Sequence, residues 1–142
     1  ILNHWDLKIW NKLFIMLDPR INKENAKLIM QWCIDKLGKS RFHQNHPKLY
    51  IHTKLRPCDK VYGEYSENNV IRIYLPNQDN MMCFIDTIIH EFWHYKQNPK
   101  GYVRVYSRMD KFTDETLPYE ISARRKAKKY KNLCYKELFN QP

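Results

Sequence analysis

Apolar residues recur at every third or fourth position in four stretches of this chain, which is the spacing of one face of an α-helix. The stretches cover residues 5–17, 23–37, 81–97 and 118–139. The first stretch ends before Pro19, because a residue that precedes proline is pushed out of the α region. The pattern therefore predicts two N-terminal helices, a central helix and a last helix.

Residues that favour helix ends lie at the boundaries of three of these stretches. Asn22 can cap the second helix, and Gly38 is placed to terminate it. Either Asp79 or Asn80 can cap the central helix, and Pro118 fits the first turn of the last helix. These residues support the helix boundaries that the apolar spacing predicts.

Between the second and the central helix the pattern changes to that of β-strands. Residues 48–54 form a short extended run. Residues 61–65 and 70–75 flank a turn at 66–69 and predict a β-hairpin, which Pro76 ends. We therefore expect a small, mainly antiparallel sheet.

The chain has 142 residues, of which 43% are hydrophobic, so it can form one domain with its own core. The grouping of helices and strands predicts a single α+β domain over residues 1–142, with the motif-bearing part at about 48–139. Residues 102–117 form a long, mostly irregular stretch, and a loop of that length in a compact domain is usually functional.

The cysteines are too widely spaced to form a C-x-x-C pair; they are Cys33, Cys58, Cys83 and Cys134. We expect reduced, mostly buried thiols in an intracellular, cytoplasmic protein. No apolar run approaches the roughly 20 residues that span a bilayer, so no membrane contact is expected. No signal peptide is recognised, although the chain begins with Ile1.

The formal net charge is +10, and basic residues are densest between Arg124 and Lys131. This excess of positive charge favours contact with nucleic acid or with an acidic protein surface. The simpler interpretation is that the charge run is the solvated face of the last helix.

The main chemical signal is the H-E-x-x-H motif of the central helix, from His90 to His94. Residues four apart lie on one face of a helix, so His90 and His94 can bind one zinc ion together. Glu91 lies about 100° around the helix from His90. At that position its carboxylate can act as the base for a zinc-bound water without binding the metal.

A catalytic zinc needs three protein ligands, and no histidine follows His94, so the third must be a carboxylate or a cysteine. Glu120 heads an otherwise apolar stripe of the last helix, where a buried carboxylate needs a partner such as a metal. The alternative is an ordinary first-turn glutamate favoured by the helix dipole. His43 and His46 could also bind metal, but their spacing favours exposed histidines.

Three segments together match a pattern known from one class of enzymes. They are Gly63-x-Tyr65 through Asn69-x-Ile71-x-Ile73, His90-Glu91-x-x-His94, and Leu117-Pro118-Tyr119-Glu120-x-x-Ala123-x-x-x-Ala127. The combination resembles the gluzincin branch of zinc metallopeptidases, most closely the minigluzincins and the ImmA/IrrE-like peptidases. It resembles the SprT-like proteases less, because their third ligand is a histidine.

The resemblance implies a zincin-like domain in which His90, His94 and Glu120 bind Zn²⁺ and Glu91 is the general base. Some gluzincins carry a carboxylate shortly after the third ligand that orients a zinc histidine. Here Ala123 and Arg124 stand at those positions.

Two further roles, orienting a zinc histidine and stabilising the transition state, each have several candidate residues. Asp86, or an acid of the 102–117 stretch, could orient a zinc histidine in place of the missing carboxylate. Those acids are Asp110, Asp114 and Glu115. Tyr102, Tyr106 and Tyr119 are candidates for stabilising the transition state, although each could be an ordinary packed or surface tyrosine.

The sequence therefore predicts zinc-dependent hydrolysis of peptide bonds. An extended peptide or protein substrate would pair with the edge of the sheet along residues 70–75, in which Val70, Arg72 and Tyr74 are the candidate contacts. The rival prediction is a zincin-shaped binding protein whose basic last helix contacts nucleic acid or an acidic partner, with a vestigial or structural metal.

Overall fold

The computed structural model of the protein describes residues 18–54, 61–100 and 117–140. Three α-helices, three strands and one short 3₁₀ helix follow one another in this part of the chain. They are α2 (Lys23–Leu37), β1 (Lys48–His52), β2 (Gly63–Ser66), β3 (Val70–Tyr74), η1 (Leu75–Asn77), α3 (Met81–Lys96) and α5 (Pro118–Leu138). The α+β class is confirmed. The helix expected over residues 5–17 lies outside the described residues.

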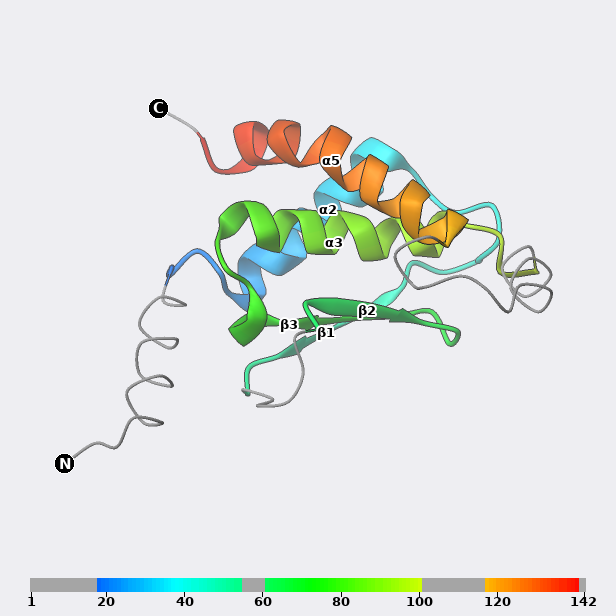
Figure 1. Ribbon diagram of the computed structural model, residues 1–142, viewed down its shortest axis with the longest axis horizontal. Helices are drawn as coiled ribbons and strands as arrows, with labels where there is room; N and C mark the ends of the chain where they lie inside the picture. Colours follow the sequence, from blue (N-terminus) through cyan, green and yellow to red (C-terminus); the bar gives the residue numbers. More distant parts are fainter. Residues whose placement is uncertain (1–17, 55–60, 101–116, 141–142) are drawn as a thin grey trace.

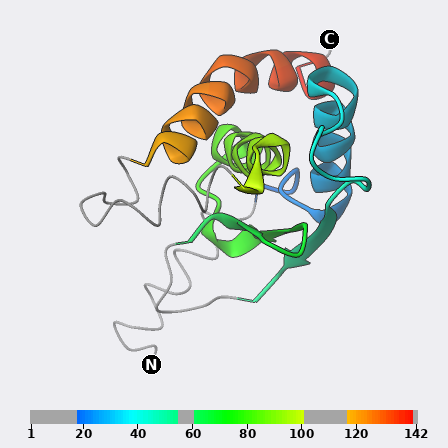
Figure 2. The same ribbon diagram turned by 90° about the vertical axis from the view of Figure 1, so that its right-hand side faces the viewer.

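Helix α3 is the centre of the fold, with the sheet on one side and α2 and α5 on the other (Figure 1). Figure 2 shows it end-on, beneath the arc of α5 and beside α2. Its apolar face is fully buried, as the helical spacing predicts; the residues are Phe84, Ile85, Ile88, Ile89, Phe92 and Tyr95. A helix covered by other elements on several sides holds its polar side chains in fixed positions.

The predicted helix ends are confirmed for all three described helices. Asn22 caps α2 by accepting a hydrogen bond from the Asn25 amide at 2.8 Å, and Gly38 follows the helix with a φ of +82°. Asn80 is the cap of α3, and its side chain accepts from the Cys83 amide at 2.8 Å. Helix α5 begins at Pro118.

The sheet is mixed, with strand order β1-β3-β2. Strands β2 and β3 form the predicted antiparallel hairpin, but β1 runs parallel to β3. The expectation of a mainly antiparallel sheet was therefore wrong. The hairpin follows from its local turn, in which Asn69 adopts a φ of +61°, whereas no local signal sets the direction of β1.

Strand β3 is the central strand, because it pairs with β1 on one side and with β2 on the other. The prediction that Val70, Arg72 and Tyr74 form a substrate-binding edge is therefore wrong. Their backbone groups face partners on both flanks, which leaves no free edge for a further strand. Among the described strands, β1 and β2 form the two edges.

Two residues hold the hairpin against α3. The buried Gln78 amide donates to the carbonyls of Tyr62 (2.8 Å) and Tyr74 (3.0 Å). Its oxygen accepts from the Thr87 hydroxyl of α3 at 3.1 Å. At Gly63 a Cβ atom would lie 2.8 Å from Thr87 Cγ2, so only glycine allows β2 to approach α3 this closely.

Helix α5 packs closely on α3 through the small, fully buried Ala123 and Ala127. The thiols of Cys33, Cys83 and Cys134 are free; Cys33 and Cys134 are buried and Cys83 is half-buried. Burial raises the pKa of Cys134 to about 12. Cys58 lies outside the described residues. Within the described residues, every helix is too short or too polar to cross a lipid bilayer.

Candidate metal centre

Two histidines of α3 and one glutamate of α5 converge at the end of the domain where the two helices meet. His90 and His94 lie one turn apart with ring centroids 5.0 Å apart. The Glu120 carboxylate bridges them, with Oε2 at 2.9 Å from His90 Nε2 and Oε1 at 2.8 Å from His94 Nε2. The candidate third ligand is thus brought to the two histidines from 26 residues further along the chain.

The three side chains could hold a metal ion, since their ligand atoms all lie within 4.8 Å of one another. Tetrahedral zinc with bonds of 2.0–2.1 Å would separate its ligand atoms by about 3.3 Å. The observed N–O separations are a few tenths of an ångström shorter. To admit a zinc ion, the carboxylate would have to move outward by that amount.

The charges of the centre also favour a cation between the three side chains. Burial alone would raise the pKa of Glu120, but hydrogen bonds from both imidazoles hold it well below its usual range. Burial opposes protonation of His94, yet the hydrogen bond to Glu120 and the charge of Glu91 raise its pKa. A proton on His94 Nε2 thus pairs with the Glu120 carboxylate, and a metal ion at that position would pair with the same carboxylate.

Glu91 directly follows His90 on α3. It is only 8% exposed. Burial raises its pKa to about 7; the charges of Glu120 and Glu64 act in the same direction, and those of the two histidines oppose them. A cation at the neighbouring site would favour the ionised form of this carboxylate. The carboxylate is thus held largely out of bulk water.

Gln97 is a residue of this site that the sequence analysis missed. Its Nε2 donates to the Tyr119 carbonyl at 2.9 Å, and a carbonyl can only accept. Its Oε1 must therefore face His94 Nδ1, at 2.7 Å, and accept that proton. The amide thus directs His94 Nε2 toward Glu120 and ties the end of α3 to the first turn of α5.

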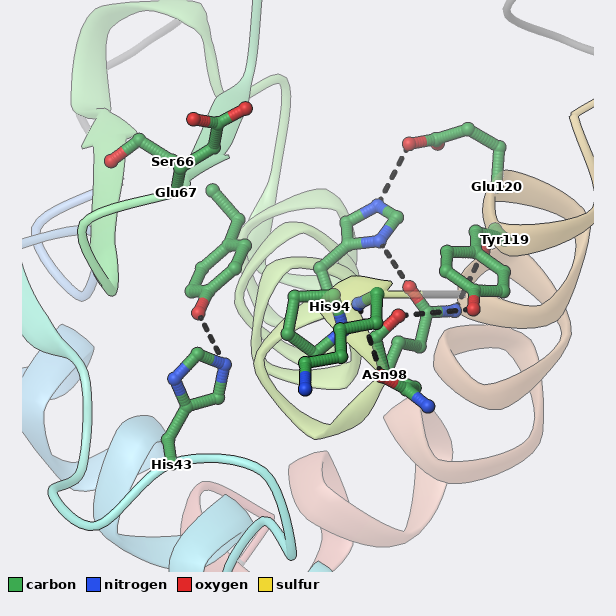
Figure 3. Close-up of a pocket in the computed structure, with 11 residues that line it drawn as sticks. His43, Ser66, Glu67, His94, Asn98, Tyr119 and Glu120 are labelled. Carbon is green, nitrogen blue, oxygen red and sulfur yellow. Dashed lines mark hydrogen bonds and ion pairs between the residues drawn. The ribbon is translucent and has the colours of Figure 1, made fainter. Parts of the chain in front are cut away.

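An open cavity of about 890 Å³ adjoins the centre, and His94, Gln97 and Glu120 form part of its wall (Figure 3). The end of β2 and the turn that follows it form another part, through Tyr65, Ser66 and Glu67. A ligand of peptide size can therefore reach His94 and Glu120 from this cavity.

The other predicted site residues have mixed outcomes. Tyr119 lines the cavity and donates its hydroxyl to the Asn98 carbonyl at 3.0 Å. Asp86 lies 3.7 Å from the Lys131 ammonium of α5 and makes no hydrogen bond with His90 among the described contacts. Its predicted role in orienting a histidine is therefore unsupported. Tyr102 and Tyr106 lie outside the described residues.

Of the two histidines before β1, His46 is exposed as expected, but His43 is half-buried. The His43 ring stacks on the buried Tyr95 at a centroid distance of 5.6 Å, and its Nε2 lies 3.3 Å from the Tyr65 hydroxyl. His43 also lines the cavity beside the metal centre (Figure 3). His43 and Tyr65 are 22 positions apart in the chain, so no local pattern could have predicted their contact.

No family model, curated protein or solved structure matches this chain. What the centre does is therefore inferred from its own geometry and from the chemistry of its residues.

Proposed function

We propose that the protein is a zinc-dependent metallopeptidase of the gluzincin type. The observation that carries this proposal is the convergence of His90, His94 and Glu120, next to the buried Glu91. Two of the three converging residues, His94 and Glu120, line an open cavity. Two imidazoles and one carboxylate are a ligand set of catalytic zinc sites, in which a fourth position is left for water or substrate.

Zinc is the metal that this donor set favours, because imidazole nitrogen suits it better than it suits calcium or magnesium. A zinc ion supplies Lewis acidity, lowering the pKa of a coordinated water to about 7 and polarising a carbonyl group. The protein supplies the positions: α3 presents two imidazoles, α5 brings the carboxylate, and Gln97 orients His94.

Glu91 is the proposed general acid–base group. Its carboxylate would accept a proton from the attacking water and deliver it to the leaving amine. Burial restricts rotation of the side chain and limits its contact with bulk water. A glutamine at this position would keep the shape of the site and remove the proton acceptor.

The substrate that fits this site is an extended peptide lying along β2. Among the described strands β2 is an edge, and its end lines the cavity next to His94. An extended chain can pair with an exposed strand edge through main-chain hydrogen bonds, which gives affinity without requiring a particular sequence. Binding along β2 replaces the predicted binding along residues 70–75, because β3 is the central strand of the sheet.

Cleavage of casein by zinc-loaded protein tests the proposal. Glu91→Gln should retain zinc but lose activity by about 10²–10⁴-fold, since only the proton acceptor is removed. His90→Ala should lose both zinc and activity. The control is Glu24→Gln in the exposed first turn of α2, which should match the wild type. Full activity in Glu91→Gln would refute the assignment, and no cleavage by zinc-loaded wild type would favour a binding function.

A further inference from the structure

The outer face of α5 carries a basic stripe made of Arg125, Lys128, Lys129 and Lys136, all of which are exposed. Their spacing of three, four and seven residues places them along one side of the helix. This side lies opposite the buried stripe of Ala123, Ala127 and Cys134. We refer to the four exposed residues as the basic face.

Among the described residues, acidic groups do not neutralise the basic face. The acidic residues of α5 are Glu120, which bridges the two imidazoles, and Glu137, which accepts from Lys36 (3.1 Å) and from the Trp32 indole (2.8 Å). In the described part of the chain no ion pair joins a carboxylate to the basic face. Much of the formal net charge of +10 is therefore presented on one helix.

The positive surface continues beyond α5 onto the end of α3. The ammonium groups of Lys126 and Lys96 lie 4.7 and 5.3 Å from the centre of the Trp93 ring. Helices α3 and α5 thus bring two ammonium groups to one indole ring, and an anion at this surface would reduce the repulsion between them.

We propose that the basic face of α5 binds the phosphate backbone of duplex nucleic acid. From Arg125 to Lys136 the helix rises about 16 Å, over which one strand of DNA carries about five phosphates. Lysine and arginine contacts to phosphate fix position without reading sequence. The binding is therefore expected to be independent of base sequence.

The composition of the face favours nucleic acid over an acidic protein. Protein interfaces are depleted in lysine and enriched in aromatic and apolar groups, whereas nucleic-acid interfaces are strongly positive. On the described length of α5, Leu133 is the one large apolar residue that is exposed. A surface of four cations with a single exposed leucine offers phosphates many contacts and a protein partner little apolar area.

The proposed surface is separate from the candidate metal centre. The cavity is lined by the ends of α3 and α5, by the β2 turn and by His43, and no residue of the basic face is among them. In Figure 2 the body of α5 arcs over α3 on the side away from the sheet. Nucleic acid could therefore lie on α5 while the cavity stays open.

Binding to a 20-base-pair DNA duplex, measured by fluorescence anisotropy at 50–200 mM salt, tests the inference. With about four phosphate contacts, the logarithm of the binding constant should fall against the logarithm of salt with a slope near −3.6. Two duplexes of unrelated sequence should bind within about threefold of each other. Salt-independent binding, or none at 50 mM, would overturn the proposal.

The decisive variant is the triple charge reversal Arg125→Glu, Lys128→Glu and Lys129→Glu. It should weaken DNA binding by about 30-fold or more and reduce the salt slope by about three, because three phosphate contacts are lost. The triple change to glutamine should weaken binding less. Both variants alter only exposed side chains, so circular dichroism should match the wild type.

A second triple reversal, at Lys23, Lys27 and Lys54, is the matched control. These lysines are exposed and lie outside α5. Each reversal removes two units of charge, so both triple variants have a formal net charge of +4 instead of +10. Equal loss of binding in the two would show that only overall charge matters and would overturn the assignment to α5.

Two further arms separate this inference from the proposed peptidase and from a protein partner. Glu91→Gln should bind DNA as the wild type does. The DNA-binding result therefore does not depend on whether the protein hydrolyses peptides. Poly-glutamate should compete much more weakly than DNA at equal charge concentration. Equal competition would identify an acidic protein surface as the partner and refute nucleic acid.

Discussion

Replacement of Gln97 by leucine isolates the part of the metal centre that orients His94. The wild-type amide accepts from Nδ1 at 2.7 Å and donates to the Tyr119 carbonyl at 2.9 Å. Leucine has a similar volume but neither hydrogen bond. The imidazole would then be free to rotate, to carry its proton on Nε2, and to turn the wrong nitrogen toward the metal.

The expected loss of zinc affinity follows from the lost orientation of His94. Loss of a group that orients a metal-binding histidine costs 10–100-fold in metal affinity, or about 1.4–2.7 kcal/mol. One net hydrogen bond supplies about 1 kcal/mol of this, and the fixed tautomer supplies the rest. Gln97→Glu keeps an acceptor for Nδ1–H, so its zinc affinity should stay within about threefold of the wild type.

Competition with a chromophoric chelator gives the zinc dissociation constants of the three proteins at pH 7.5. Gln31→Leu is the control, because Gln31 is an exposed residue of α2 that bonds only Asp35 in the described structure. The reasoning is refuted if Gln97→Leu binds zinc as tightly as the wild type. It is also refuted if Gln97→Glu and Gln97→Leu lose affinity equally.

Three further predictions concern stability. Gly63→Ala should destabilise the fold by about 1–3 kcal/mol in urea unfolding, because its Cβ would meet Thr87 Cγ2 at 2.8 Å. Gln78→Leu should cost about 2–4 kcal/mol in the same assay, because it removes the buried amide that bonds two carbonyls and a hydroxyl. In metal-free protein the raised pKa of His94 and the lowered pKa of Glu120 give stability that is present between about pH 4.5 and 6.5. The contribution of His94 is lost as the pH rises through its raised pKa, whereas that of Glu120 is lost as the pH falls. Zinc needs neutral imidazoles, so the gain in Tm on adding zinc should increase from pH 6 to pH 8, and a constant gain would contradict the assignment.

The helices of this fold are predictable because their signals are local. Asn22, Asn80 and Pro118 mark helix starts through their own side chains, and the apolar spacing of α3 marks the face that the core covers. The order of the strands in the sheet, by contrast, cannot be predicted from local signals. The turn at 66–69 brings β2 and β3 together, but the parallel pairing of β1 with β3 depends on how the whole chain packs.

The same distinction applies to the site. His90 and His94 come together through helical spacing alone, and Glu120 could be selected because a carboxylate at the head of a buried stripe requires a partner. Gln97 could have been found by asking which side chain, one turn after His94, reaches its other nitrogen. His43 could not, because its position depends on the loop before β1 and on the ring of Tyr95.

The zinc content of the Glu120→Ala protein tests the central claim most directly. The account predicts one zinc ion per chain in the wild type after dialysis against a weak chelator, and less than about a tenth of that in Glu120→Ala. The control Glu24→Ala, in the exposed first turn of α2, should retain one ion. One zinc ion per chain in Glu120→Ala would contradict the claim that α3 and α5 share a metal centre.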